Sequence, residues 1–160
     1  MPVATGETAV ADDFEALRAR VVGYQLPGGT FEVAEYERFL SHDAILSPRL
    51  PAGVLHPTWV LLGALRGMGM TMEEVAEIAG AGKDDVVMFG QSSIDQVIGL
   101  KTAVPYVVAG KIASLTRKEG KRGGIMHSYE VELTISTGDG QLCAVSSQTF
   151  LILKGAANGA

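Results

Sequence analysis

One apolar stretch, residues 57–70, limits what this chain can fold into more than any other feature. It has the sequence PTWVLLGALRGMGM, and from Thr58 to Met70 the only charged residue is Arg66. Pro57 suits the first position of a helix, where its missing N–H costs nothing. Apolar residues fall on every side, so the predicted helix must be buried nearly all round. At about 1.5 Å per residue it spans roughly 20 Å, too short to cross a bilayer.

The sequence after this helix indicates what buries it. In residues 125–136 apolar and polar residues alternate, which predicts a strand with one buried and one solvated face. The sequence TGDG at 137–140 predicts a hairpin turn. We therefore predict an α+β fold, in which a curved antiparallel sheet wraps around the central helix at about 57–70. The expected long strands are residues 86–94, 106–116, 125–136 and 142–153.

Three shorter helices are expected around the central one. Asp12 or Asp13 can cap the first, which ends at Gly23. The second covers residues 31–40 and is followed by an irregular segment, residues 41–53. Thr71 and Glu74 have the spacing of a capping box, which predicts that the third begins there.

The composition indicates a globular protein with a real core. Of the 160 residues 47% are apolar and 19% charged, which excludes a disordered chain. The net charge of −5 argues against a nucleic-acid surface, and no membrane segment is expected. The single Cys143 excludes an internal disulfide and favours the cytoplasm. We expect a disordered N-terminus at 1–10, one domain at 11–154 and a frayed C-terminus at 155–160.

The only basic cluster, residues 117–122, lies between two predicted strands. We interpret it as a hairpin loop, with contact to a phosphate-bearing ligand as the alternative. His127 is expected to face solvent or a subunit interface. Gly63 and Gly67 have the spacing that allows strands to approach a helix closely. The histidines and Cys143 lack the spacing of a zinc site, so no metal is expected.

Several stretches resemble the MaoC-like (R)-specific enoyl-CoA hydratases and dehydratases, which have the hot-dog fold. FEVAEYERFL at 31–40 is similar to the family's entry to its catalytic loop, and PAGVLHPTW at 51–59 to its entry to the hot-dog helix. The resemblance covers most of residues 28–153. Two further stretches carry it: residues 91–95 followed by 100–110, which resemble a strand pair, and GDGQL at 138–142, which resembles the final hairpin.

The resemblance implies a hydration chemistry that this sequence can only partly supply. In the family an Asp and a His activate one water, and a backbone N–H at the start of the central helix polarises the thioester carbonyl. The family motif is Asp-x-Asn-Pro-x-His. Here it begins at Asp43 but lacks the Asn, the Pro and the His, since Ile45, Leu46 and Pro48 occupy those positions. The resemblance therefore implies a degenerate catalytic motif.

If the chain itself carries chemistry, Asp43 is the first catalytic candidate and His56 the second. The alternatives are a turn residue or helix cap for Asp43 and a helix cap or packed core residue for His56. A pair between His42 and Asp43 is not expected, because neighbours in an extended segment point to opposite faces. The resemblance also suggests substrate-binding residues at the start and along one side of the central helix: Pro57, Thr58, Trp59 and Arg66.

Three functions follow from these observations. The first is a hydratase or dehydratase subunit for acyl-CoA or acyl-carrier thioesters, as a homodimer or with a catalytic hot-dog subunit, without a cofactor. The short segment 48–55 would then leave room for a long or bulky acyl group. The second is an acyl-CoA thioesterase, with Asp95 as a possible acid or base. The third is a structural or acyl-binding partner without chemistry of its own, which the incomplete motif favours.

Overall fold

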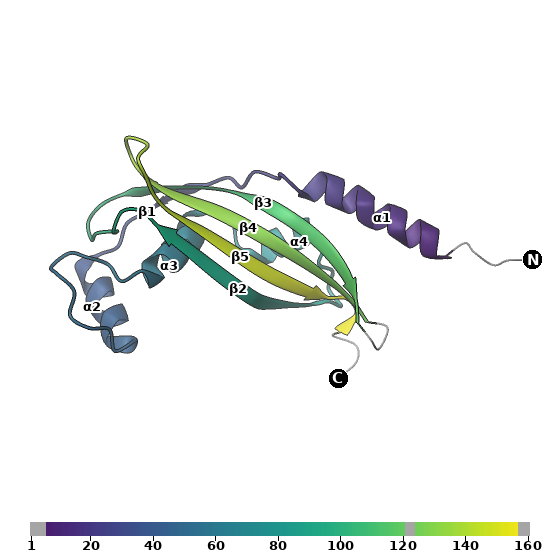
Figure 1. The fold of residues 1–160 in the computed structure, drawn as a ribbon, viewed down its shortest axis with the longest axis horizontal. Coiled ribbons are helices and arrows are strands. Elements are labelled where there is room, and N and C mark those ends of the chain that lie inside the picture. Colours follow the sequence, from purple (N-terminus) through teal and green to yellow (C-terminus); the bar gives the residue numbers. More distant parts are fainter. Residues whose placement is uncertain (1–5, 121–123, 157–160) are drawn as a thin grey trace, which may run out of the picture.

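The computed structural model describes residues 6–120 and 124–156. Within them the chain forms one antiparallel sheet of five strands in the order β1-β3-β4-β5-β2. Figure 1 shows this curved sheet in front of the helices α3 (Thr58–Gly67) and α4 (Met72–Ile78). The predicted fold, an antiparallel sheet against a central helix, is confirmed. The strands are β1 (Gly29–Phe31), β2 (Val86–Gln96), β3 (Tyr106–Glu119), β4 (Ile125–Thr137) and β5 (Leu142–Leu153).

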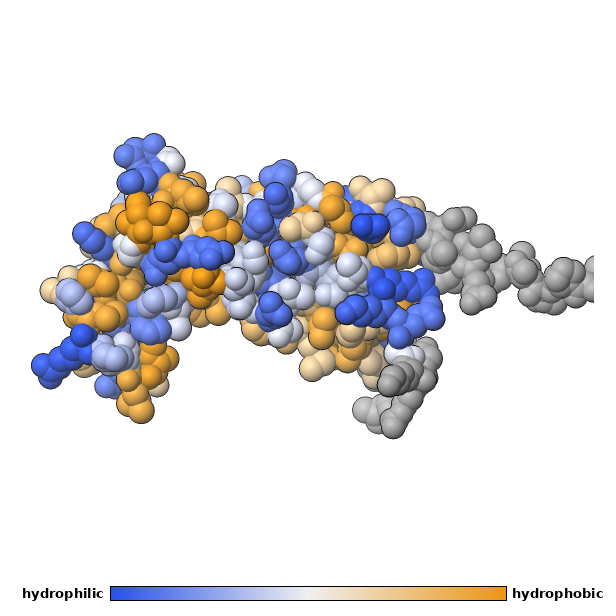
Figure 2. Space-filling view, in the orientation of Figure 1, coloured by the Kyte–Doolittle hydropathy of each residue, from blue (hydrophilic) through white to orange (hydrophobic). Residues whose placement is uncertain are grey.

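The sheet has a packed inner face and a partly solvated outer face. Along β4, buried residues alternate with half-buried ones, as the sequence pattern predicts. Hydrophilic and hydrophobic side chains are interspersed on the face visible in Figure 2. His127 is on the inner face and only 7% exposed, so the expectation that it faces solvent is wrong. The reason is that His127 and Tyr129 are two residues apart, and a strand places such residues on one face.

The central helix α3 lies very close to the sheet. A Cβ atom added at Gly67 would lie 2.5 Å from Cγ2 of Val108 in β3, and one added at Gly63 would overlap the ring of Phe31 in β1. The prediction that these glycines allow close approach is confirmed. The helix is shorter than the predicted 57–70, because the chain turns away at Gly69 with a φ of 83°.

The prediction that α3 is buried nearly all round is wrong. Leu62 is 45% exposed and Arg66 is also exposed, whereas Trp59, Val60 and Ala64 are buried. The sheet curves around one side of the helix only, and Figure 1 shows no strand on the other side. The opposite side of α3 therefore carries apolar surface that the described residues do not cover.

The boundaries of two further helices also differ from the expected ones. Helix α1 (Gly6–Val21) starts before the predicted cap, and residues 1–5 lie outside the described part. Helix α2 spans Glu35–Ala44 instead of residues 31–40, because Phe31 belongs to β1 and the Glu37 carboxylate accepts the Ala34 N–H at 2.9 Å.

None of the helices in residues 6–120 and 124–156 has the length and apolar character needed to cross a bilayer.

Two other predictions concern local signals. The capping box is confirmed: the Thr71 hydroxyl accepts the Glu74 N–H at 3.2 Å, and the Glu74 carboxylate accepts the Thr71 N–H at 2.7 Å. The basic cluster is only partly a loop, since β3 continues to Glu119 and so includes Arg117 and Lys118. Residues 121 and 122 of that cluster lie outside the described part of the chain.

The C-terminal end of α2 has an unusual residue in a common motif. The N–H of Ser47 donates to the carbonyl of His42 at 2.9 Å, and the N–H of Leu46 donates to the carbonyl of Asp43 at 3.1 Å. This is the Schellman pattern, in which glycine usually occupies the left-handed position. Here Leu46 occupies it, with a φ of 52° and 88% of its surface exposed.

We expect Leu46→Gly to stabilise the protein by about 0.5 to 1 kcal/mol. The left-handed conformation costs a residue with a Cβ about 1–2 kcal/mol, and glycine's greater freedom in the unfolded chain offsets part of that gain. The measurement is the midpoint of urea unfolding. Ile45→Gly is the matched control, because Ile45 has a φ of −95° and gains nothing from glycine. A lower midpoint for Leu46→Gly than for the wild type would contradict the prediction.

Candidate functional site

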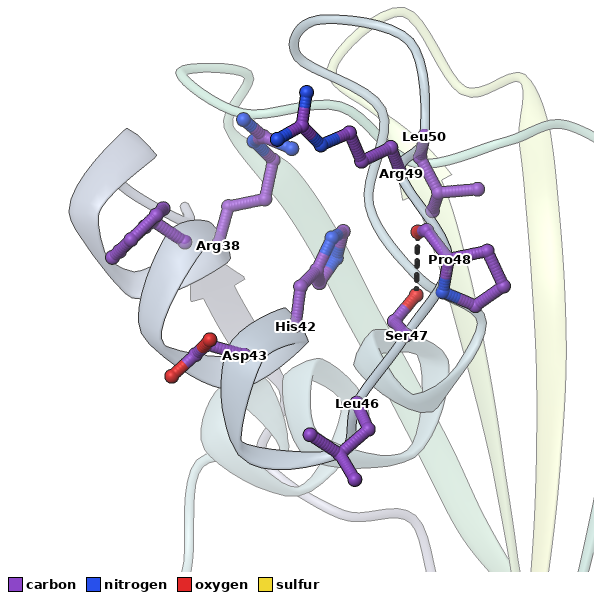
Figure 3. Close-up of a pocket in the computed structure, with 9 residues that line it drawn as sticks. Arg38, His42, Asp43, Leu46, Ser47, Pro48, Arg49 and Leu50 are labelled. Carbon is purple, nitrogen blue, oxygen red and sulfur yellow. Dashed lines mark hydrogen bonds between the residues drawn. The ribbon is translucent and has the colours of Figure 1, made fainter.

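A cavity of about 590 Å³ lies between the C-terminal half of α2 and the loop that follows it. Figure 3 shows His42 pointing into this space from the helix, toward the loop residues Ser47 and Pro48. Arg38 and Arg49 approach from opposite sides and bring two guanidinium groups to one end of the cavity. The full lining is Arg38, Phe39, His42, Asp43, Leu46, Ser47, Pro48, Arg49 and Leu50.

His42 joins this cavity to the start of the central helix. Its Nε2 atom accepts a hydrogen bond of 2.9 Å from the backbone N–H of His56. This bond needs a lone pair on Nε2, so in the neutral ring Nδ1 carries the proton. Burial, together with the nearby Arg38 and His56, lowers the pKa of His42 and keeps the ring neutral. The ring therefore presents a donor rather than a base to any ligand that reaches Nδ1.

The N–H groups at the start of α3 already have partners within the chain. Nδ1 of His56 accepts the Thr58 N–H at 3.2 Å and lies 3.0 Å from the Thr58 hydroxyl oxygen. The Trp59 N–H donates to the His56 carbonyl at 2.9 Å. These are the groups that an oxyanion hole would use, so a substrate carbonyl must displace a partner to bind them. His56 thus accepts the first N–H of α3 with its side chain, while Pro57 is the N-cap residue.

Asp43 lines the cavity but does not pair with His42. Its side chain is exposed, and in Figure 3 its carboxylate points away from the His42 ring. The rings of His42 and His56 are neighbours. Their centroids lie 6.1 Å apart, and the rings meet nearly edge to face. Among the described residues, neither catalytic candidate, Asp43 or His56, forms an acid–base pair with His42 through its side chain.

Sequence reasoning missed the position of His42. It placed this residue in an irregular segment, whereas α2 continues through it and buries the ring to 8% exposure. The sequence did contain a signal that the helix continues to His42. Arg38 and His42 lie four residues apart, so on a helix they share one face.

Two of the suggested substrate-binding residues connect α3 to α2. Trp59 is 4% exposed, and its indole N–H donates to the Ser41 hydroxyl at 3.0 Å. Arg66 lies over the Trp59 ring, 5.2 Å from its centre, and pairs with Glu37 at 2.9 Å. Both side chains therefore have structural contacts. Pro57 is exposed at the start of the helix, and Thr58 is half-buried beside His56.

Comparison with known proteins identifies the architecture. No protein-family model and no curated protein sequence matches the chain. Its structure is similar to the C-terminally truncated HadBC (3R-hydroxyacyl-ACP dehydratase) complex from Mycobacterium tuberculosis, with a TM-score of 0.64 and 12% identity. That match covers 82% of this chain and 96% of the other. A hot-dog-like protein from Thermanaerovibrio acidaminovorans matches with a TM-score of 0.53 and 13% identity, over 88% and 87% of the two chains.

The chain has the hot-dog fold. A thioesterase superfamily member from Thermus thermophilus is also similar, with a TM-score of 0.56 and 14% identity over 88% of each chain. The hot-dog neighbours thus include both a dehydratase complex and a thioesterase superfamily member. At these identities the likeness shows the fold, and the reaction has to be argued from the residues of this chain.

Proposed function

We propose that this chain is the acyl-thioester-binding subunit of a heteromeric enoyl thioester hydratase or 3-hydroxyacyl dehydratase, whose partner hot-dog subunit supplies the Asp and His pair. The observation that carries this proposal is the occupied N-terminus of α3. The Thr58 N–H at the start of the helix is bonded to His56, the His56 N–H just before it is bonded to His42, and the Asp43 carboxylate points away from the His42 ring. Hydration needs an acid and a base that share one water, and this arrangement does not provide them.

The unpaired edge of the sheet supports the need for a partner subunit. Strand β2 is at the edge, runs for 11 residues, and pairs on one side only, with β5. Its first four residues, 86–89, are all apolar and between 37% and 54% exposed. Long apolar edges favour association, so pairing with a second hot-dog subunit would remove this liability. The likeness to a dehydratase complex agrees with a heteromer.

The charge of the cavity supports a thioester carrier as the ligand. Arg49 is exposed at its rim, and Arg38 lies opposite, paired with Glu35. Coenzyme A and the prosthetic group of acyl carriers both contain phosphate, which arginine binds well. No cofactor is part of this proposal, and a long or bulky acyl group remains the expected substrate.

A thioesterase is the second candidate function. The likeness to a thioesterase superfamily member favours it, and Asp95 lies exposed on β2. In such an enzyme a carboxylate would activate water toward the carbonyl carbon, and free coenzyme A would be released.

The test is an assay of the purified chain with short, long and ring-bearing 2-enoyl-CoA thioesters. We expect to detect binding by isothermal titration calorimetry but no hydration. Hydration is monitored as the loss of the absorbance of the enoyl thioester. Arg49→Ala should weaken binding several-fold, whereas Asp43→Asn should leave it unchanged.

Three results would contradict the proposal. Hydration that disappears in Asp43→Asn or His56→Gln would make the chain a self-sufficient hydratase. Release of free coenzyme A that disappears in Asp95→Asn would make it a thioesterase. Absence of binding to every thioester, from a well-folded protein, would remove the acyl-binding role.

A further inference from the structure

A second cavity, of about 570 Å³, lies between α4 and the inner face of the sheet. It is at the beginning of β2, whereas the cavity described above belongs to α2 and its following loop. Its volume is in the range of small-molecule sites. The lining is Met72, Glu73, Ala76, Glu77, Ala81, Gly82, Lys83, Asp85, Val87, Phe89, Tyr129 and Phe150.

Tyr129, which lines this cavity, carries a buried hydroxyl group without a partner. Tyr129 has no exposed surface, and its hydroxyl makes no hydrogen bond to any residue that the structure describes. Buried polar groups are nearly always hydrogen-bonded, so an orphaned one calls for an explanation. Burial raises the pKa of Tyr129 to about 12, so the hydroxyl keeps its proton and can donate.

A second orphaned group lies next to Tyr129 on the inner face. Tyr129 is opposite Phe150, and the neighbouring inward position of β5 is Gln148. Gln148 is also fully buried, and its Oε1 atom has no hydrogen-bond partner among the described residues. Its amide nitrogen donates to the Ser146 hydroxyl at 3.2 Å. The Tyr129 hydroxyl and the Gln148 amide oxygen are therefore two unpartnered hydrogen-bonding groups at neighbouring inward positions of β4 and β5.

Aromatic rings connect the surface of the cavity to Tyr129. Phe89 is 54% exposed on β2 and meets Phe150 edge to face, with ring centroids 5.4 Å apart. Phe150 in turn stacks on Tyr129, at 5.3 Å and an interplanar angle of 20°. Flat molecules gain offset-stacked or edge-on contacts with such rings.

The charges around the cavity restrict what can enter it. Glu73 and Glu77 on α4 are two carboxylates, and the remaining acid, Asp85, already pairs with Lys154. Lys83 is the one cationic side chain in the lining. An excess of negative charge disfavours phosphate and carboxylate ligands. The apolar rings of Phe89 and Phe150 make the burial of a cation costly, so a neutral molecule fits this cavity best.

We propose that this cavity is a second binding site, for a flat, neutral and largely apolar molecule with one oxygen that hydrogen-bonds the Tyr129 hydroxyl. The site uses no residue of α2 or α3. Because Val87 and Phe89 belong to the β2 edge that is proposed above to meet a partner subunit, the test uses the chain without a partner.

The test compares 2-naphthol with naphthalene, two flat probes that differ by one hydroxyl group. Binding is measured by isothermal titration calorimetry for the wild type, Tyr129→Phe and the matched control Tyr24→Phe. Tyr24 is 37% exposed and outside the cavity. The wild type and the control should bind 2-naphthol about 3 to 10 times more tightly than naphthalene, as one added hydrogen bond allows. Tyr129→Phe should abolish this preference without weakening naphthalene binding.

Phe89→Ala locates the site independently, because this exposed side chain can be truncated without opening the core. It should weaken the binding of both probes several-fold. The proposal would be overturned by no binding of either probe, by a preference for 2-naphthol that survives in Tyr129→Phe, or by binding that Phe89→Ala leaves unchanged. Equal binding of both probes to the wild type would likewise overturn it, because the Tyr129 hydroxyl would then have no role.

Discussion

Gly63→Ala is expected to destabilise the protein by about 1 to 3 kcal/mol, although alanine is the better helix former. Alanine in place of glycine normally gains about 1 kcal/mol inside a helix. Here the added Cβ would overlap the ring of Phe31. That ring is 4% exposed and packs against Tyr106 with centroids 5.5 Å apart, so it has no free space to enter. The cost of displacing either α3 or β1 therefore exceeds the helix-propensity gain.

The measurement is urea unfolding followed by circular dichroism. Gly99→Ala is the matched control, because a Cβ added there meets no atom within 4 Å, and we expect its stability to stay within about 0.5 kcal/mol of the wild type. A Gly63→Ala variant as stable as the wild type would mean that α3 does not pack against β1 as closely as the structure indicates.

The strands and the packing of α3 could be predicted because the signals are local. Alternation from Ser128 to Ser136 requires only the period of a strand and one apolar environment. The spacing of Gly63 and Gly67 predicts a close contact, although it does not name the ring or the side chain that fills it. The exposed side of α3 could not be predicted, because the sequence of a helix does not show how far a sheet curves around it.

The boundaries of α2 were harder to predict because its end signals are atypical. Its N-terminus depends on a Glu37 side chain that turns back to Ala34, without a serine, threonine or aspartate as the cap. Its C-terminus has Leu46 where glycine would mark the end. Without these signals the prediction ended the helix at residue 40, and this error placed His42 in a segment without a defined face.

The sequence pointed to residues near the cavity at α2 but not to their arrangement. The motif resemblance led to Asp43 and to the start of α3, and both lie near the cavity at α2. The hydrogen bond from the His56 N–H to His42 joins residues 14 positions apart, and no spacing rule predicts such a contact. The orphaned hydroxyl of Tyr129 was equally hidden, because alternation shows that the side chain points inward and not what its hydroxyl meets.

Asp85→Ala is expected to lower the free energy of unfolding by about 3 kcal/mol. The Asp85 side chain is only 7% exposed. Its carboxylate accepts hydrogen bonds from the N–H groups of Gly82 and Gly155, each at 2.8 Å, and from Lys154 Nζ at 2.5 Å. These contacts connect the loop before β2 to the residues after β5. Removing the carboxylate leaves the Gly82 and Gly155 N–H groups without this acceptor and the Lys154 ammonium without its counter-ion, although Lys154 still donates to the Gly80 carbonyl at 2.8 Å.

The same contacts predict how stability depends on pH. Burial alone raises the pKa of Asp85, but the hydrogen bonds from Lys154, Gly82 and Gly155 outweigh it and hold the pKa below its usual value. A carboxyl group with a lower pKa in the folded state contributes stability above its unfolded pKa, about 3.9, and loses it as the pH falls through the folded value. The wild type should therefore lose more stability between about pH 4 and pH 2 than Asp85→Ala does.

The neighbouring Asp84 provides the control for both measurements. Asp84 is exposed, so Asp84→Ala should change the stability by less than about 0.5 kcal/mol and should leave the acid dependence as it is in the wild type. If Asp85→Ala and Asp84→Ala had equal stabilities at neutral pH, the carboxylate of Asp85 would not hold β2 and β5 together. If they differed at neutral pH but lost stability in parallel on acidification, the contacts would stabilise the fold without the lowered pKa.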